Sequence, residues 1–210
     1  MINLRQTLFA LSSLGVSALF AGNPNSATVP RFEPNRGQFT TVKGEPAPFI
    51  LLKAEGKGLS TYLTTTGLSY VFTKRVTESL EEKRKAGPKQ RPFFRTKPKV
   101  VTAEMAWAHM HLEGADIRPE NIVLEEEGTA RYDYFLKHCP QGITGLHRYG
   151  RAIVREVYPG VDWVLYTNEH GLKYDFIVHP NGDPNDIRFV YHSEQPVSPT
   201  ADGGISIPTG

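Results

Sequence analysis

The chain has 210 residues, 39% of them hydrophobic and 22% charged, and a formal net charge of +2 at pH 7. This length and balance fit one globular domain, and they exclude a disordered chain and one embedded in a membrane. The net charge is too small to imply any partner, while 19 Gly and 16 Pro residues favour many short strands over long helices.

The N-terminal residues have the pattern of a secretory signal peptide. A short basic stretch precedes an apolar run from Leu8 to Phe20, and Ala21 or Ala27 offers the small residue at which cleavage occurs. An uncleaved anchor helix is the alternative, but the apolar run is shorter than the ~20 residues that span a bilayer. We therefore expect residues 1–27 to be a signal peptide and residues 28–210 to form a secreted or cell-surface domain without a membrane span.

Alternation of apolar and polar residues is clear in the segment "GLSTYLTTTGLSYVFT", residues 58–73. It predicts a hairpin with one mostly apolar face, as packing on a core requires. If Thr64 to Gly67 form the turn, the cross-strand pairs are Leu63 with Leu68, Thr61 with Tyr70, and Leu59 with Phe72.

Residues 74–99 have a different composition, with ten Lys or Arg against three Glu, three Pro and little alternation. We expect a basic, solvated, variable loop with a short helix near Ser79 to Lys85. The alternative is an arm that binds nucleic acid or another anionic polymer, with Phe93 and Phe94 as stacking groups. Because no nucleic-acid-binding fold is recognisable in this exported chain, nucleic acid is the less favoured partner.

Short strands resume after this loop, with Gly, Pro, Asn or Asp at most junctions and no helical period between them. This spacing predicts an all-β domain, an antiparallel β-sandwich of Greek-key or jelly-roll type. The last strand, in "DGGISIPTG", has no evident closing partner, so we expect a longer parent chain. The predicted strands are residues 100–112, 121–127, 132–137, 151–157, 161–167, 172–179, 187–192 and 204–207.

The stretch "VYPGVDWVLYTNEHGLKYDFIVHPNGDPNDIRFVY", residues 157–191, contains the clearest hairpin. With a loop over Asn168 to Gly171, one face is apolar, and a shift of one residue would destroy that segregation. The apolar cross-strand pairs are then Leu165 with Tyr174, Trp163 with Phe176, and Val161 with Val178.

The opposite face of this hairpin carries Asp162 and Asp175 on a diagonal, with Cα atoms roughly 7 to 8 Å apart. Two carboxylates at that spacing can flank a water molecule, as in an inverting glycosidase, so they are the candidate catalytic pair. The competing interpretation places both on a half-solvated outer face. We favour it, because catalysis also needs one desolvated carboxyl with a raised pKa, and no pattern here indicates one.

The segment "NGDPNDI" offers oxygen ligands of the kind that Ca²⁺ accepts, in Asp183, Asn185 and Asp186, with Asn181 nearby. It lacks the D-x-D-x-D-G spacing with a distant Glu that defines an EF-hand loop. Asn-Gly followed by Asp-Pro is in itself sufficient for a turn, which is the favoured interpretation.

Two histidines, His109 and His111, fall on one face of the predicted strand at 100–112, together with Trp107. Imidazoles at this spacing can share a zinc ion, but no C-x-x-C or H-E-x-x-H motif accompanies them. Exposed histidines on a strand are favoured, and no metal or cofactor is predicted. The residues that would have to complete a zinc site are His138, Cys139 or His147.

Cys139 is the only cysteine in the chain, which excludes an internal disulfide. A lone thiol in an oxidising compartment is either reactive toward another molecule or a small buried apolar side chain, and we favour the second.

Motifs for a catalytic nucleophile or a phosphate loop are missing: no G-x-S-x-G occurs, and "EGKGLST" has Thr61 where G-x-G-x-x-G needs its third glycine.

Six segments occur in the order found in a known bacterial family: "FEPNRGQ", "YLTTTGLSYVF", "MHLEGA", "YDYFL", the stretch at 157–191 and "DGGISIPTG". On these residues the chain resembles an uncharacterised N-terminal domain of large secreted bacterial proteins that commonly continue into SBBP-type β-propeller repeats. The resemblance spans Phe32 to Gly210 and is strongest from Tyr158 to Pro184. It implies export, β structure and a longer parent protein, but no reaction.

The chain departs from that family's pattern at "YDYFLKHCPQG", where relatives usually have Asn-Tyr-Phe followed by Gly-Asn-Asp-Pro and a Trp.

The first functional hypothesis is a non-catalytic extracellular module at the front of a larger protein, with a scaffolding, adhesive or ligand-presenting role. Its partners would be the following β-propeller repeats or other domains of the same chain, and an extracellular glycan or protein. The second is a carbohydrate-active enzyme or accessory domain that uses Asp162 and Asp175, and the third is a packing cap for the first propeller blade.

Overall fold

The computed structural model describes residues 29–41, 43–56, 58–77, 101–168, 171–201 and 204–208. The predicted signal peptide and residues 78–99 of the predicted basic loop, including its expected short helix, lie outside these ranges. No helix within them is long and apolar enough to cross a membrane.

Regular structure in these ranges is almost entirely antiparallel strand, which confirms the predicted all-β class. Two short 3-10 helices, η1 (Pro119–Asn121) and η2 (Pro184–Asp186), are the other described elements. The strands are β1 (Phe32–Pro34), β2 (Ile50–Gly56), β3 (Leu59–Thr64), β4 (Gly67–Thr77), β5 (Val101–Leu112), β6 (Ile122–Glu127), β7 (Tyr132–Leu136), β8 (Cys139–Leu146), β9 (Tyr149–Tyr158), β10 (Val161–Asn168), β11 (Gly171–Val178), β12 (Phe189–Ser193), β13 (Ser198–Pro199) and β14 (Ile205–Ser206).

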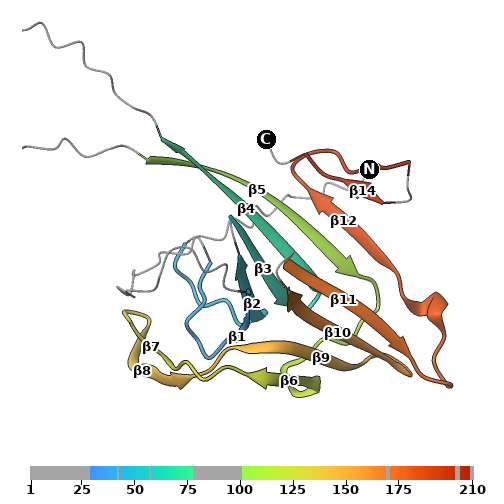
Figure 1. Cartoon of the computed structure of the whole chain (residues 1–210), viewed down its shortest axis with the longest axis horizontal. Helices are drawn as coiled ribbons and strands as arrows, with labels where there is room; N and C mark the ends of the chain where they lie inside the picture. Colours follow the sequence, from blue (N-terminus) through green and yellow to red (C-terminus); the bar gives the residue numbers. More distant parts are fainter. Residues whose placement is uncertain are drawn as a thin grey trace, which may run out of the picture.

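Most described strands belong to one large sheet in the order β11-β10-β9-β1-β2-β3-β4-β5-β12, with β6 also paired to β9. The sheet curls, so that β10 and β11 face β4 and β5 in two layers of a sandwich-like arrangement (Figure 1). The Tyr174 hydroxyl of β11 reaches the Met110 sulfur of β5 at 3.4 Å, as does the Tyr191 hydroxyl of β12 at 3.3 Å. Both ends of the sheet therefore meet through side chains at one core residue.

The core lies between these layers and is built from the inward face of each strand. Trp163 is fully buried, stacks on Phe176 with ring centroids 5.6 Å apart, and meets Tyr174 edge-on at 6.0 Å. Burial of such rings supplies much of the hydrophobic stabilisation of a domain this size. Other members of the same cluster are Phe32, Leu52, Leu63, Leu68, Met110, Leu112, Val154 and Leu165.

Both predicted hairpin registers are confirmed. Leu63 pairs with Leu68 and Leu59 with Phe72 across β3 and β4. Across β10 and β11, the observed pairs include Trp163 with Phe176 and Leu165 with Tyr174, as expected. One face of each hairpin enters the core, so a slip of one residue would expose that whole apolar set to water.

The predicted start of the basic loop at residue 74 is wrong. Strand β4 continues to Thr77, and its last residues pair in register with the beginning of β5. Lys74 lies opposite Glu104, and their side chains form an exposed ion pair at 3.8 Å. Backbone pairing with β5 extends the strand here although three of its last four residues are of polar or charged types, and composition alone did not indicate it.

Candidate functional site

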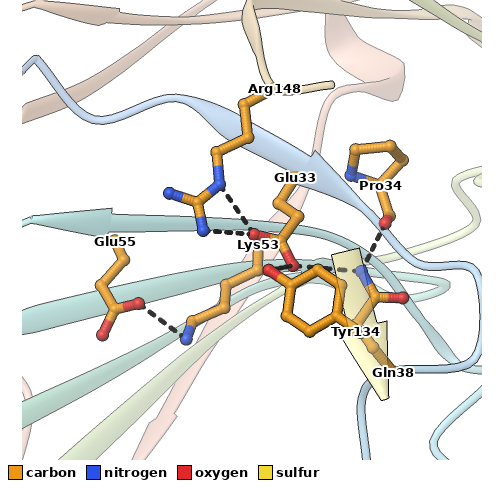
Figure 2. A network of polar contacts seen from close by, with 7 residues as sticks. All are labelled: Glu33, Pro34, Gln38, Lys53, Glu55, Tyr134 and Arg148. Carbon is orange, nitrogen blue, oxygen red and sulfur yellow. Dashed lines mark hydrogen bonds and ion pairs between the residues drawn. The ribbon is translucent and has the colours of Figure 1, made fainter. Parts of the chain in front are cut away.

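Strand β1 places Glu33 on the face of the sheet opposite the main core. Its neighbour Phe32 points into the core, and alternation turns Glu33 outward, directly across from Lys53 of β2. Glu33 is nevertheless only 5% exposed, since the side chains of Gln38, Tyr134 and Arg148 lie against it (Figure 2). A carboxylate buried to this degree is tolerated when its oxygens are paired.

Three side chains from other parts of the chain converge on the Glu33 carboxylate (Figure 2). Arg148 Nε and Nη2 donate to Oε2 at 2.8 and 2.6 Å, while Oε1 accepts from Tyr134 Oη at 2.7 Å and from Gln38 Nε2 at 3.1 Å. Both oxygens of Glu33 thus accept two donors each. Such a fully paired buried charge fixes the geometry of the groups around it.

The partners of Glu33 are themselves held in place. The Arg148 guanidinium lies over the Tyr132 ring, 4.0 Å from its centroid, in a cation–π contact. Burial, followed by the hydrogen bond to Glu33, raises the pKa of Tyr134 to about 12, so that its hydroxyl stays a donor at neutral pH. We call Glu33, Gln38, Tyr134 and Arg148 the Glu33 network.

The rest of the "FEPNRGQ" segment explains how the chain reaches this arrangement. Asn35 Nδ2 donates to the carbonyls of Ala47 and Ile50 at 3.0 and 2.7 Å, which closes the loop between β1 and β2. Gln38 Nε2 also donates to the Pro34 carbonyl at 2.8 Å. The polar residues of this segment therefore fold a loop and complete the Glu33 network.

A pocket of about 580 Å³ lies beside the Glu33 network, on the outer face of β1 and β2. The segment Gly128 to Ala130, between β6 and β7, forms its opposite wall. The size is in the range of small-molecule sites, about 300 to 1,000 Å³. We call this the β1–β2 pocket, and its charged and aromatic lining residues are Arg31, Glu33, Lys53, Glu55, Tyr132 and Arg148.

A second, apolar pocket of about 360 Å³ lies between the β1–β2 loop and β6. Its walls include Phe39, Ile50, Leu52, Ile122 and Leu124, with Asn35 as a polar lining residue. Since Asn35 already donates to two loop carbonyls, this pocket has few groups that would orient a polar ligand.

Asp162, one of the predicted catalytic pair, is buried instead of half-solvated. It is 3% exposed, and it accepts from Arg155 Nη1 at 2.7 Å, from the Glu156 amide at 2.9 Å and lies 3.3 Å from His179 Nε2. Burial opposes ionisation, but hydrogen bonds from the Glu156 amide, His179 and Arg155 outweigh it and lower the pKa of Asp162. The expectation of a solvated outer face was wrong for this residue, because these neighbours cover it.

Asp162 lies opposite an irregularity in the sheet. The register of β9 and β10 shifts between Val161, which pairs with Tyr158, and Trp163, which pairs with Val154. Asp162 therefore faces the bulged residues of β9, and its bond to the Glu156 amide satisfies a donor that the shifted ladder does not use.

Asp175 lies on the same face of the hairpin, as predicted, but it is exposed and interacts with Tyr166. The structure thus gives the two carboxylates separate partners: Arg155 and His179 for Asp162, and a tyrosine for Asp175. A joint catalytic role for the pair stays the less favoured hypothesis.

A family model described as "Domain of unknown function (DUF7948)" matches residues 32–210. The chain belongs to the DUF7948 family. The match begins at the residue before Glu33 and includes every residue of the Glu33 network and of the hairpin at 161–178. A comparison with curated proteins found no match, and one with solved structures found none either.

The candidate calcium ligands of this DUF7948 domain lie in the turn before β12. Asp183 caps η2, and its Oδ1 accepts from the Asn185 amide at 2.9 Å and from Asn185 Nδ2 at 2.8 Å. Asp186 is the last residue of η2. Across the described ranges, no three His, Cys, Asp or Glu side chains are grouped so that they could hold a metal ion.

His109 and His111 face away from the core, as predicted, since Ala108, Met110 and Leu112 on the other side of β5 are buried. The expectation that they are exposed was wrong, because both are half-buried. The structure adds His192 of β12 to them: ring centroids are 6.2 Å apart for His109 and His111, and 6.5 Å for His111 and His192. The candidates His138 and Cys139 are in the β7–β8 hairpin, and His147 follows it.

Cys139 is half-buried, and its thiol donates to the Gly37 carbonyl at 3.0 Å. It therefore packs against the "FEPNRGQ" loop of the DUF7948 domain, and the favoured interpretation as a buried apolar side chain was wrong, because the thiol is only half-buried and is hydrogen-bonded.

The sequence patterns did not point to Glu33, Lys53 or Arg148 as site residues. The only available signal was the polar "FEPNRGQ" motif, in which a Glu follows a core Phe in an extended segment. Its partner Arg148 is 115 residues away, so nothing local to the motif identifies it.

Proposed function

We propose that this DUF7948 domain is a non-catalytic extracellular module that binds a ligand, with a scaffolding or adhesive role at the front of a larger secreted or cell-surface protein. The observation that carries the proposal is the β1–β2 pocket, in which the Glu33 network fixes Glu33 and Arg148 and an ion pair joins Lys53 to Glu55. Preformed walls favour binding, because little side-chain entropy is lost when a ligand enters.

The state of Asp162 also supports binding over hydrolysis. In an inverting pair the general acid needs a raised pKa, and Asp162 does not fit that role, because its pKa is lowered and it forms an ion pair with Arg155 at 2.7 Å. Its contacts are those expected of a residue that stabilises the bulge between β9 and β10.

Export is supported by the signal-peptide pattern at residues 1–27 and by the resemblance to N-terminal domains of SBBP-repeat proteins. On this proposal the intramolecular partners are the following β-propeller repeats or other domains of the same parent chain. The external partner is an extracellular glycan or protein held in the β1–β2 pocket.

A glycan array probed with the full chain tests the proposal, with the K53M variant alongside and K74M as the control. Lys74 is also a strand lysine with a carboxylate partner, but it lies on β4 and does not line the pocket. We expect retention by the wild type and K74M, a weaker signal from K53M, and no cleavage of retained glycans. Released products would overturn the non-catalytic assignment, and equal signals from all three proteins would overturn the pocket assignment.

A further inference from the structure

We propose that the β1–β2 pocket recognises a hydroxylated carboxylate, namely a uronic acid unit of an extracellular polysaccharide. This inference rests on the proposed function, since it names the ligand class of the same pocket. It follows from the balance of hydrogen-bond donors and acceptors that the lining residues have left after pairing with one another.

Donors are in excess at the pocket wall. Lys53 Nζ donates to Glu55 at 2.9 Å, which leaves two of its three N–H groups. Arg31 donates from Nη1 to the Glu126 carbonyl at 2.7 Å, and no carboxylate of the described residues forms an ion pair with it. Glu33 cannot balance these cations, because its four contacts already occupy both oxygens. The unmatched donors call for an anionic oxygen on the ligand.

Lys53 is well placed to bind such an oxygen strongly. Its side chain is only 13% exposed and lies along the Tyr62 ring, with the ammonium 6.0 Å from the ring centroid. Hydrogen bonds from a partly desolvated ammonium are stronger than those made in open water.

One acceptor at the pocket indicates that the ligand also carries hydroxyl groups. The Glu55 side chain is 59% exposed, and Lys53 engages only its Oε2. A bare anion such as sulfate has no hydrogen-bond donor, so it would leave this carboxylate unused. A uronic acid offers a carboxylate to Lys53 and Arg31, and ring hydroxyls that donate to Glu55.

Isothermal titration calorimetry on the full chain tests this assignment with five probes: a trimer of galacturonic acid, a trimer containing glucuronic acid, the methyl ester of each, and sodium sulfate. We expect one of the two acidic trimers to bind. The methyl ester of that trimer, and sulfate, should each bind at least about tenfold more weakly, because charge-assisted hydrogen bonds are lost. The K53M and R31Q variants should each lose about tenfold or more in affinity, while K74M keeps the wild-type value. Thermal melts of the three variants establish that each one folds.

The outcomes separate this inference from the proposed function. Equal binding of acid and ester, with loss in K53M, would overturn the uronic acid assignment but keep a glycan-binding pocket. Equal binding of sulfate and trimer would reduce the pocket to a simple anion site. If acidic trimers do not bind, the uronic acid assignment is wrong, whatever the array shows. If the acidic trimers bind K53M and R31Q with the same affinity as the wild type, the β1–β2 pocket is not the binding site and both proposals fail.

Discussion

Asp162 is a buried anion, and its replacement should cost stability. In D162N the ion pair with Arg155 is lost and an amide NH₂ group is placed among donors, so we expect the free energy of unfolding to fall by about 2 kcal/mol. The exposed D175N should change it by no more than about 0.5 kcal/mol. Urea unfolding of both variants checks this.

If D162N is as stable as the wild type, the structural role assigned to Asp162 is wrong, and the catalytic interpretation becomes the better account of that carboxylate. The pH dependence provides a second check. The pKa of Asp162 is lower in the fold than its ordinary value of 3.8, so its contribution to stability is present above that value and is lost as the pH falls through the folded pKa.

His109 should make the stability of the domain sensitive to mild acid. Burial, followed by the nearby His111 and His192, lowers the pKa of His109 to about 4 from 6.5, while hydroxyls of Ser69 and Thr66 lie within hydrogen-bonding distance of its ring nitrogens. The unfolded chain binds a proton at His109 near pH 6.5 and the folded chain near pH 4. Stability should therefore decrease as the pH falls between these values.

Thermal melts at pH 7 and pH 4.5 of the wild type and H109Q check this expectation. The loss of melting temperature on acidification should be smaller in H109Q, since Gln does not titrate. An identical loss in both proteins would show that other groups cause the acid sensitivity.

At the scale of elements, two turns depend on a close backbone contact. A Cβ added to Gly160, which follows β9, would lie 2.7 Å from the amide nitrogen and 2.8 Å from the Cα of Gly182, which follows β11. The His179 amide also donates to the Gly160 carbonyl at 2.8 Å. This contact ties the turn at the end of β9 to the end of the β10–β11 hairpin.

G160A should therefore destabilise the domain by about 2 kcal/mol or more, from overpacking added to the left-handed backbone conformation at φ 69°. Gly114, at φ 74° with open space around it, separates the two causes. G114A should cost only about 1 kcal/mol, the backbone part. Equal effects in urea unfolding would show that the Gly160–Gly182 contact contributes nothing.

The Glu33 network joins the β7–β8 hairpin to the main sheet through Tyr134. In E33Q, Arg148 loses its buried partner and Gln38 faces an amide, so we expect a loss of about 3 kcal/mol in unfolding free energy. Hydrogen exchange of the Y134F variant, which lacks only the hydrogen bond from Tyr134 to Glu33, shows which strands the network stabilises. Amides of β7 and β8 should exchange faster in Y134F, while the β10–β11 hairpin keeps its protection; uniform change across the sheet would contradict this role of the network.

Sequence patterns predicted these elements unevenly. The β3–β4 and β10–β11 registers follow from apolar alternation, because only one register buries the Leu, Trp and Phe side chains. Strand β1 has three residues, too few to display a period, and β8 contains Pro140, Gly142 and Gly145, which indicate turns. Pairing with neighbouring strands, not local preference, makes these two segments strands, and β8 is irregular at Gly142 and Gly145, which have positive φ.

At the scale of the whole molecule, the curled sheet brings together pocket residues that are far apart in the sequence, so sequence patterns could not predict the pocket. The β1–β2 pocket is assembled from residues 29–33, 53–55, 128–132 and 148, which only the sheet order brings together. Asp162 and Asp175 were candidates for a catalytic pair because they are close in sequence and register, yet they have different partners. The charged residues that were not predicted, Glu33 and Arg148, are joined through tertiary contacts alone.

The most direct test of the binding account is two-dimensional NMR of the ¹⁵N-labelled chain, titrated with the glycan that gives the strongest array signal. We predict that shifted amides cluster at the β1–β2 pocket, in residues 31–33, 53–55 and 128–132, and that Asp162 and Asp175 are unaffected. Shifts centred on Asp162 and Asp175, with the pocket amides unchanged, would contradict it.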